Sequence, residues 1–154
     1  MNTLKTIRNT ACVLLASVLL TGAAFAEGAT KIIPGPKGGR MLTKAAPHAE
    51  FFVEKDRKVT VTFYGADLKP VAPAEQVVMV IAEAKAGKVK LDMEKKPNGF
   101  TSKQPLPEGN KYQVVVQIRE KGDAKPVNYR LLFNDEICAE CHRAEYACIC
   151  DDAH

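Results

Sequence analysis

The stretch EFFVEKDRKVTVTFY, residues 50–64, contains two runs of side chains with a period of two, separated by the polar residues 55–57. In the second run Val59, Val61 and Phe63 alternate with threonine and tyrosine. This period is typical of a β-strand with one face on a core. Two such runs joined by a short polar turn predict a β-hairpin.

The same pattern continues toward the C-terminus, with further strands expected at 76–83, 88–94, 100–103, 112–119 and 127–133. Residues 88–94 show the cleanest alternation, which predicts Val89, Leu91 and Met93 on the inward side. Turn residues separate the segments at intervals of about ten residues. Together they predict an all-β fold, an immunoglobulin-like antiparallel β-sandwich over residues 49–133.

The N-terminus predicts an export signal over residues 1–26. Lys5 and Arg8 precede an almost wholly apolar run, and Ala24-Phe25-Ala26 is a typical cleavage site. The run of fourteen residues (11–24) is too short to span a membrane, which takes about twenty. We therefore expect a periplasmic or secreted protein, without a membrane span after cleavage and with four cysteines once Cys12 is removed. Residues 27–48 are expected to form an irregular arm, since 34–39 are rich in proline and glycine.

Charge divides the chain into a basic body and an acidic tail. Residues 134–154 contain six acidic residues and only Arg143 on the basic side, whereas the preceding body is basic. The lysines of the body form no run and are not interleaved with aromatic residues, so we expect no binding to nucleic acid. The sequence also lacks a catalytic triad order or a nucleotide motif, and we expect no enzymatic activity.

The tail, residues 134–154, concentrates metal-binding side chains. The donors are Cys138, Cys141, His142, Cys148, Cys150 and His154. Asn134 or Asp135 is suited to cap one or two helical turns over 136–146, which would place the first three donors on one face. Cys148 and Cys150 would point the same way in an extended segment. Folded back, that segment would bring the two thiol pairs together.

Four thiolates, or three with an imidazole, match the tetrahedral site that Zn²⁺ prefers, and thiolates equally suit Cu(I). The sequence therefore favours a metal-binding protein that holds Zn or Cu(I), with buffering or delivery as its role. Two alternatives remain. Cys138, Cys141 and His142 match the C-x-x-C-H signature of c-type haem attachment, which would make the protein a monohaem electron carrier. Cross-paired disulfides would make the tail a structural staple or interaction module.

Four segments of the body form a recognisable pattern of turns and strands: GPKGGRML (35–42), the hairpin from His48, DLKPVAP (67–73) and PLPEGNKYQVVVQI (105–118). In these segments the chain resembles small periplasmic immunoglobulin-like domains associated with bacterial heavy-metal and copper efflux systems. The resemblance implies a sandwich fold and a metal-efflux component as partner. It supplies no ligands, because the cysteine tail has no counterpart in the pattern.

Overall fold

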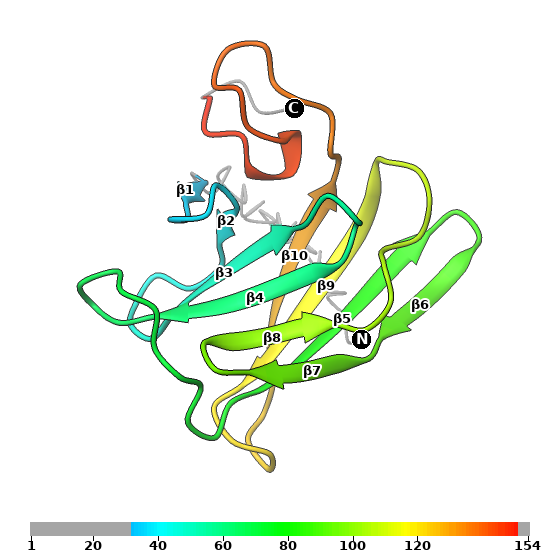
Figure 1. Cartoon of the computed structure of the whole chain (residues 1–154). Coiled ribbons are helices and arrows are strands. Elements are labelled where there is room, and N and C mark those ends of the chain that lie inside the picture. The colour runs from blue at the N-terminus through cyan, green and yellow to red at the C-terminus, as the bar shows by residue number, and fades with distance from the viewer. Residues whose placement is uncertain (1–31, 151–154) are drawn as a thin grey trace, which may run out of the picture.

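Two antiparallel β-sheets make up the computed structural model, which describes residues 32–150 (Figure 1). The strands are β1 (Ile33–Pro34), β2 (Arg40–Met41), β3 (His48–Val53), β4 (Val59–Tyr64), β5 (Val77–Ala84), β6 (Gly87–Leu91), β7 (Met93–Lys96), β8 (Gly99–Ser102), β9 (Tyr112–Arg119) and β10 (Val127–Phe133). One sheet has the order β1-β2-β3-β4-β8-β7 and the other β10-β9-β5-β6. The expected all-β sandwich is confirmed. Apart from β1 and β2, its strand order is that of an immunoglobulin-type sandwich with one extra edge strand, β6.

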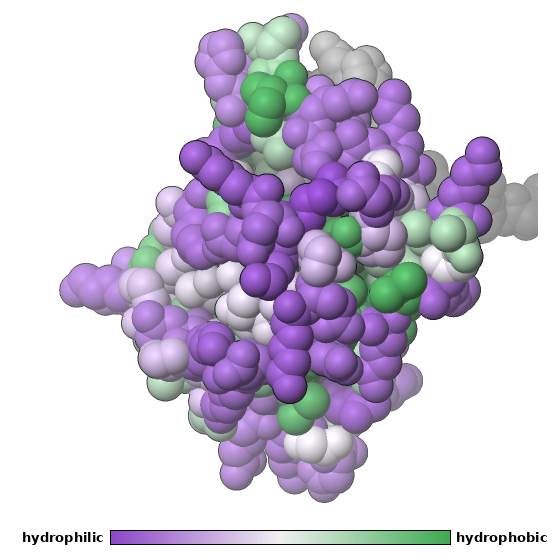
Figure 2. Space-filling model, turned by 45° about the vertical axis from the view of Figure 1, so that its right-hand side comes forward, coloured by the Kyte–Doolittle hydropathy of each residue, from purple (hydrophilic) through white to green (hydrophobic). Residues whose placement is uncertain are grey.

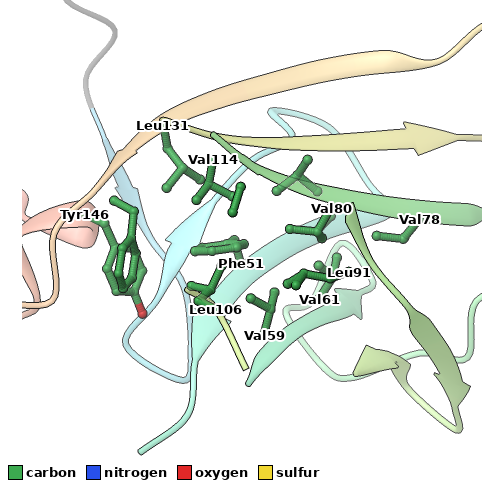
Figure 3. Packing of buried hydrophobic residues seen from close by; sticks show 14 of the residues in the cluster. Phe51, Val59, Val61, Val78, Val80, Leu91, Leu106, Val114, Leu131 and Tyr146 are labelled. Atoms are coloured by element: carbon green, nitrogen blue, oxygen red, sulfur yellow. The ribbon is translucent and has the colours of Figure 1, made fainter. Parts of the chain in front are cut away.

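The predicted hairpin of residues 50–64 is the β3–β4 pair, which runs in register from His48 opposite Tyr64 to Val53 opposite Val59. Its alternation places Phe51 and Val61 in the core, where neither is exposed. They pack against apolar side chains of the second sheet, including Val80 and Val114 (Figure 3). Burying a side chain of this size contributes about 1.5–3 kcal/mol, so the alternating residues stabilise the sandwich as expected.

Residues 88–94 form two strands in different sheets, where one was predicted. β6 pairs with β5 in the four-stranded sheet, and after Asp92 the chain crosses to β7, which pairs with β8. Leu91 is buried as expected, but Val89 remains 39% exposed. Val89 lies opposite Ala82 and thus on the inward side. It stays exposed because β6 is the outermost strand of its sheet.

The arm expected to be irregular contains β1 and β2, which extend the first sheet beyond β3. The loop between them wraps around the fully buried carboxylate of Glu50. This carboxylate accepts hydrogen bonds from the backbone N–H groups of Lys37 (3.0 Å) and Gly39 (2.8 Å) and from the Tyr64 hydroxyl (2.7 Å). Gly35 must lack a side chain, since a Cβ there would lie 2.2 Å from the Glu50 carboxyl carbon.

Candidate metal centre

The tail leaves the sandwich at the end of β10 and folds against that end of the two sheets (Figure 1). Arg57, in the β3–β4 turn, forms an ion pair with Asp135 at the start of the tail. The same guanidinium donates to the backbone carbonyls of Pro107 (2.7 Å) and Gly109 (2.9 Å). Arg57 thereby ties the hairpin turn, the loop before β9 and the tail to one another.

The first cysteine pair lies in a tight loop, not in the helix that the sequence predicted. Ile137 forms an antiparallel bridge with Ala144, and the Cys138 N–H donates to the Arg143 carbonyl across the loop (2.8 Å). The Cys138 carbonyl accepts from the His142 N–H (3.0 Å), where His142 has a φ of 53°. These contacts reverse the chain. Cys138 and Cys141 lie where the chain turns, and no α-helix forms within residues 32–150.

Helical structure follows the first cysteine pair. The 3-10 turn η1 (Glu145–Ala147) carries Tyr146, which is 4% exposed and belongs to the core cluster of the sandwich (Figure 3). Its ring contacts Phe51 edge-on, with centroids 5.5 Å apart, and stacks on Phe133 at 5.8 Å. The Val53 N–H donates to the Tyr146 hydroxyl (3.0 Å). An aromatic anchor therefore separates the two cysteine pairs.

After η1 the backbone becomes extended at Cys148, with φ −62° and ψ 137°, as the C-x-C spacing led us to expect. This brings the second pair back onto the first. The sulfurs of Cys138 and Cys150 lie 3.8 Å apart, and those of Cys141 and Cys148 lie 3.6 Å apart. All four sulfurs lie within 4.8 Å of one another, a group that can hold a metal ion.

These separations suit a tetrahedral ion. Zn–S bonds of about 2.3 Å place the sulfurs of a regular tetrahedron about 3.8 Å apart. Two of the sulfur pairs already have this spacing, at 3.6 and 3.8 Å. The remaining separations, at most 4.8 Å, need to shorten by about 1 Å or less. We conclude that a four-thiolate site needs only a small contraction of the loop.

The thiols of Cys141, Cys148 and Cys150 differ in their ease of ionisation. Backbone N–H groups of Ile149 and Arg143 lower the pKa of Cys141 to about 6. The pKa of Cys150 is raised by hydrogen bonds with the Cys148 thiol and the Glu140 carboxylate. The backbone N–H of Cys150 lowers the pKa of Cys148, but burial and the neighbouring thiols outweigh it, and the net shift is upward. Cys141 is thus better prepared to ionise than Cys148 or Cys150.

Of the two predicted histidine ligands, His142 stands apart from this cluster. His142 is exposed and lines a groove on the side of the β3–β4 hairpin, and the four-cysteine group does not include its imidazole. His154 lies outside the described residues, as do the predicted signal peptide and Cys12. Of the five predicted donors within residues 32–150, the structure brings four together, all of them cysteines.

Two residues that position the site, Tyr146 and Arg57, are not among the residues predicted from the sequence. Tyr146 is the only aromatic residue among residues 134–154. A single aromatic side chain between the two cysteine pairs is the one feature of the sequence that could have indicated packing of the tail into the core. Nothing in the local sequence distinguishes Arg57 from the other cations of the body, because its partners lie 50 to 78 residues away.

No protein-family model, no curated protein and no solved structure matches this chain. None of the helices among residues 32–150 has the length and apolar character needed to cross a membrane.

Proposed function

We propose that this protein is an exported metal-binding protein whose C-terminal tail holds one Zn²⁺ or Cu(I) ion through Cys138, Cys141, Cys148 and Cys150. The single observation that carries the proposal is the convergence of four sulfurs from two separate segments within 4.8 Å. Four converging thiols form a closed ligand set, which holds an ion without an open position for catalysis. The role is therefore binding, and not chemistry on a substrate.

The burial of the cluster suits an ion that can be exchanged. Cys138 and Cys148 are buried, whereas Cys141 and Cys150 are only partly covered. A thiolate of an incoming protein can therefore reach the ion from the side of Cys141 and Cys150, which is what buffering or delivery requires. The predicted export signal and the resemblance of the body to efflux-associated domains support a periplasmic metal-efflux component as the partner.

Zn²⁺ is the better fit of the two ions. Four sulfur donors in a near-tetrahedral arrangement are typical of zinc. Cu(I) also prefers thiolates, and its binding would be consistent with the same four residues. The metal content of the purified protein decides directly between the two ions.

The same geometry favours one alternative, cross-paired disulfides. The close pairs, Cys138 with Cys150 and Cys141 with Cys148, are the ones that oxidation would join. The haem alternative has less support, because the His142 imidazole is not in the cluster and the thiols of Cys138 and Cys141 face two further cysteines.

The test uses the full chain, exported with its own leader into a periplasm with an active haem-attachment system. Metal content, the visible spectrum and the number of thiols titrated in denaturant, with and without reductant, are measured on the same sample. We expect about one zinc or copper ion per chain, no Soret band and about four thiols without reductant. A Soret band would overturn the proposal in favour of haem, and metal-free protein that shows thiols only after reduction would overturn it in favour of disulfides.

A matched pair of variants separates the thiol site from a haem site. Cys148→Ser removes a thiol that the haem motif does not use, and His142→Ala removes the axial ligand that haem requires. We expect Cys148→Ser to lower metal affinity about a hundredfold or more and His142→Ala to leave it unchanged. The opposite order of effects contradicts the four-cysteine site.

A further inference from the structure

A groove of about 1080 Å³ separates the tail from the β3–β4 hairpin. One wall consists of the end of β3, the turn after it and the start of β4, together with Lys37 and Gly38 of the β1–β2 loop and Thr101 of β8. The other wall consists of tail residues on either side of His142. The four cysteines do not line it. The groove is thus a feature distinct from the candidate metal centre, although the same loop builds part of both.

Cations outnumber anions along the groove. Its lining includes five basic side chains, Lys37, Lys55, Arg57, Lys58 and Arg143, and three acidic ones, Glu54, Asp56 and Asp135. Each acidic side chain is paired with a basic one: Glu54 with Lys37, Asp56 with Lys58, and Asp135 with Arg57. The salt bridges of the described chain leave Lys55 and Arg143 without an acidic partner. The groove therefore has two cationic side chains in excess.

Arg143 is the more informative of the two. Its Nη1 is buried and has no hydrogen-bond partner among residues 32–150. Gly38, in the β1–β2 loop, lies beside this nitrogen and has no side chain to offer; a Cβ there would lie 3.9 Å from Nη1. A buried donor without a partner is unfavourable, and a guanidinium is the side chain best shaped to bind a carboxylate through two parallel hydrogen bonds. Arg143 is prepared for an anionic ligand.

Apolar surface flanks this cation. Ile137 lines the groove and is 65% exposed, the highest value among the large apolar side chains of residues 32–150. Phe52 lines the facing wall and is half-buried. Figure 2 shows apolar side chains on the tail at the top of a largely hydrophilic face. The groove thus combines an unpaired cation with apolar side chains, in a volume larger than a small inorganic ion needs.

We propose that this groove binds an extended peptide segment of a partner protein in which a carboxylate side chain is flanked by apolar ones. Arg143 receives the carboxylate, Lys55 adds charge at the rim, and Ile137 and Phe52 contact the apolar neighbours. The inference goes beyond metal binding and does not depend on which ion the cysteines hold. It gives the protein a recognition site for an acidic, partly apolar segment.

The experiment uses the full-length, as-purified protein and a fluorescein-labelled peptide of alternating leucine and aspartate, followed by anisotropy. The same peptide with asparagine at every aspartate and inorganic phosphate as a competitor are the two other probes. We expect the aspartate peptide to bind at least about tenfold more tightly than the asparagine peptide. Phosphate at millimolar concentration should displace it only weakly, since phosphate lacks the apolar contacts.

Variants locate the binding site. Arg143→Gln should weaken binding of the aspartate peptide about tenfold or more, whereas Arg119→Gln, at the far end of β9, should not change it. Ile137→Ser should weaken binding of the aspartate peptide, but it should not change the phosphate concentration that is needed to displace the bound peptide. Metal content and the urea midpoint of each variant show whether the tail is intact; if Arg143→Gln disturbs them, Lys55→Gln and Ile137→Ser carry the test.

Equal affinity for the two peptides overturns the proposal, as does an equal effect of Arg143→Gln and Arg119→Gln. Binding of phosphate alone, dependent on Arg143, would replace it with a small-anion site. If the protein binds metal normally and no peptide, the groove inference fails while the metal-binding function stands. If peptide binds to protein whose cysteines hold no metal, the groove stands and the metal-binding function fails.

Discussion

The backbone N–H of Val53 donates a hydrogen bond to the hydroxyl of Tyr146, 93 residues away in sequence, across 3.0 Å. The bond joins the end of β3 to the 3-10 turn between the two cysteine pairs. Tyr146 and Ala147 also belong to the core cluster of the sandwich. The acidic tail is therefore packed as part of the body, and its thiols are positioned by the same core that holds the sheets together.

This anchor predicts a graded loss of stability at Tyr146. Tyr146→Phe keeps the ring but leaves the Val53 N–H without its acceptor, so we expect the free energy of unfolding to fall by about 1 kcal/mol. Tyr146→Ala also removes the stacking on Phe133 and should cost about 3–5 kcal/mol. Urea unfolding measures both, with Tyr129→Phe on β10 as the control. No difference between the Phe and Ala variants would show that the ring is not packed in the core.

Arg57 and Asp135 predict a measurable coupling between the β3–β4 turn and the tail. Both side chains are partly exposed, at 24% and 38%, so solvent screening limits the ion pair to about 1 kcal/mol in a double-mutant cycle with alanine. Arg57→Ala alone should cost about 2 kcal/mol, because the carbonyls of Pro107 and Gly109 lose their donor too. The exposed pair of Asp56 and Lys58 is the matched control, expected to show no resolvable coupling because solvent screens it fully. Equal coupling in the two pairs would contradict the role of Arg57.

The sandwich could be predicted from periodicity because alternation reports directly on which side chains face a core. Where the chain changes sheets, alternation is uninformative. Residues 88–94 keep one period across Asp92, yet β6 and β7 belong to different sheets. A period of two continues through such a crossing, and only the long-range pairing of each half shows it.

The candidate site was predicted in composition but not in conformation. Residues 136–146 lack glycine and proline, which favoured a helix. The observed loop instead depends on the bond between the Cys138 N–H and the Arg143 carbonyl and on a positive φ at His142. Burial of Tyr146 against Phe51 and Phe133 fixes where the helical turn can form. These contacts are tertiary, and local propensity does not reveal them.

The hydrogen bonds of the Glu50 carboxylate predict that this one side chain stabilises the folded N-terminal arm. Glu50→Gln replaces one acceptor oxygen with an amide donor that faces the N–H groups of Lys37 and Gly39, so we expect a loss of about 2 kcal/mol in the free energy of unfolding. Amide hydrogen exchange at Gly39 should accelerate in parallel. Glu54→Gln removes the exposed ion pair with Lys37, keeps an oxygen that can accept from the Thr60 hydroxyl, and should cost about 0.5 kcal/mol or less. Similar losses in the two variants would mean that the arm is not organised by Glu50.

The packing of the tail into the core also predicts that metal stabilises the whole domain. An ion that binds only the folded tail adds free energy in proportion to the logarithm of its concentration over its Kd, about 2.7 kcal/mol at a hundredfold excess. Because Tyr146 and Ala147 lie in the core cluster, the melting temperature of the sandwich should rise with added Zn²⁺ and fall when a chelator removes it. Cys148→Ser should abolish this dependence while the metal-free domain stays folded, since the sheets contain no cysteine. If the protein binds zinc but its melting temperature does not change when zinc is added, the tail folds independently of the sandwich. That result would contradict the contacts of Tyr146.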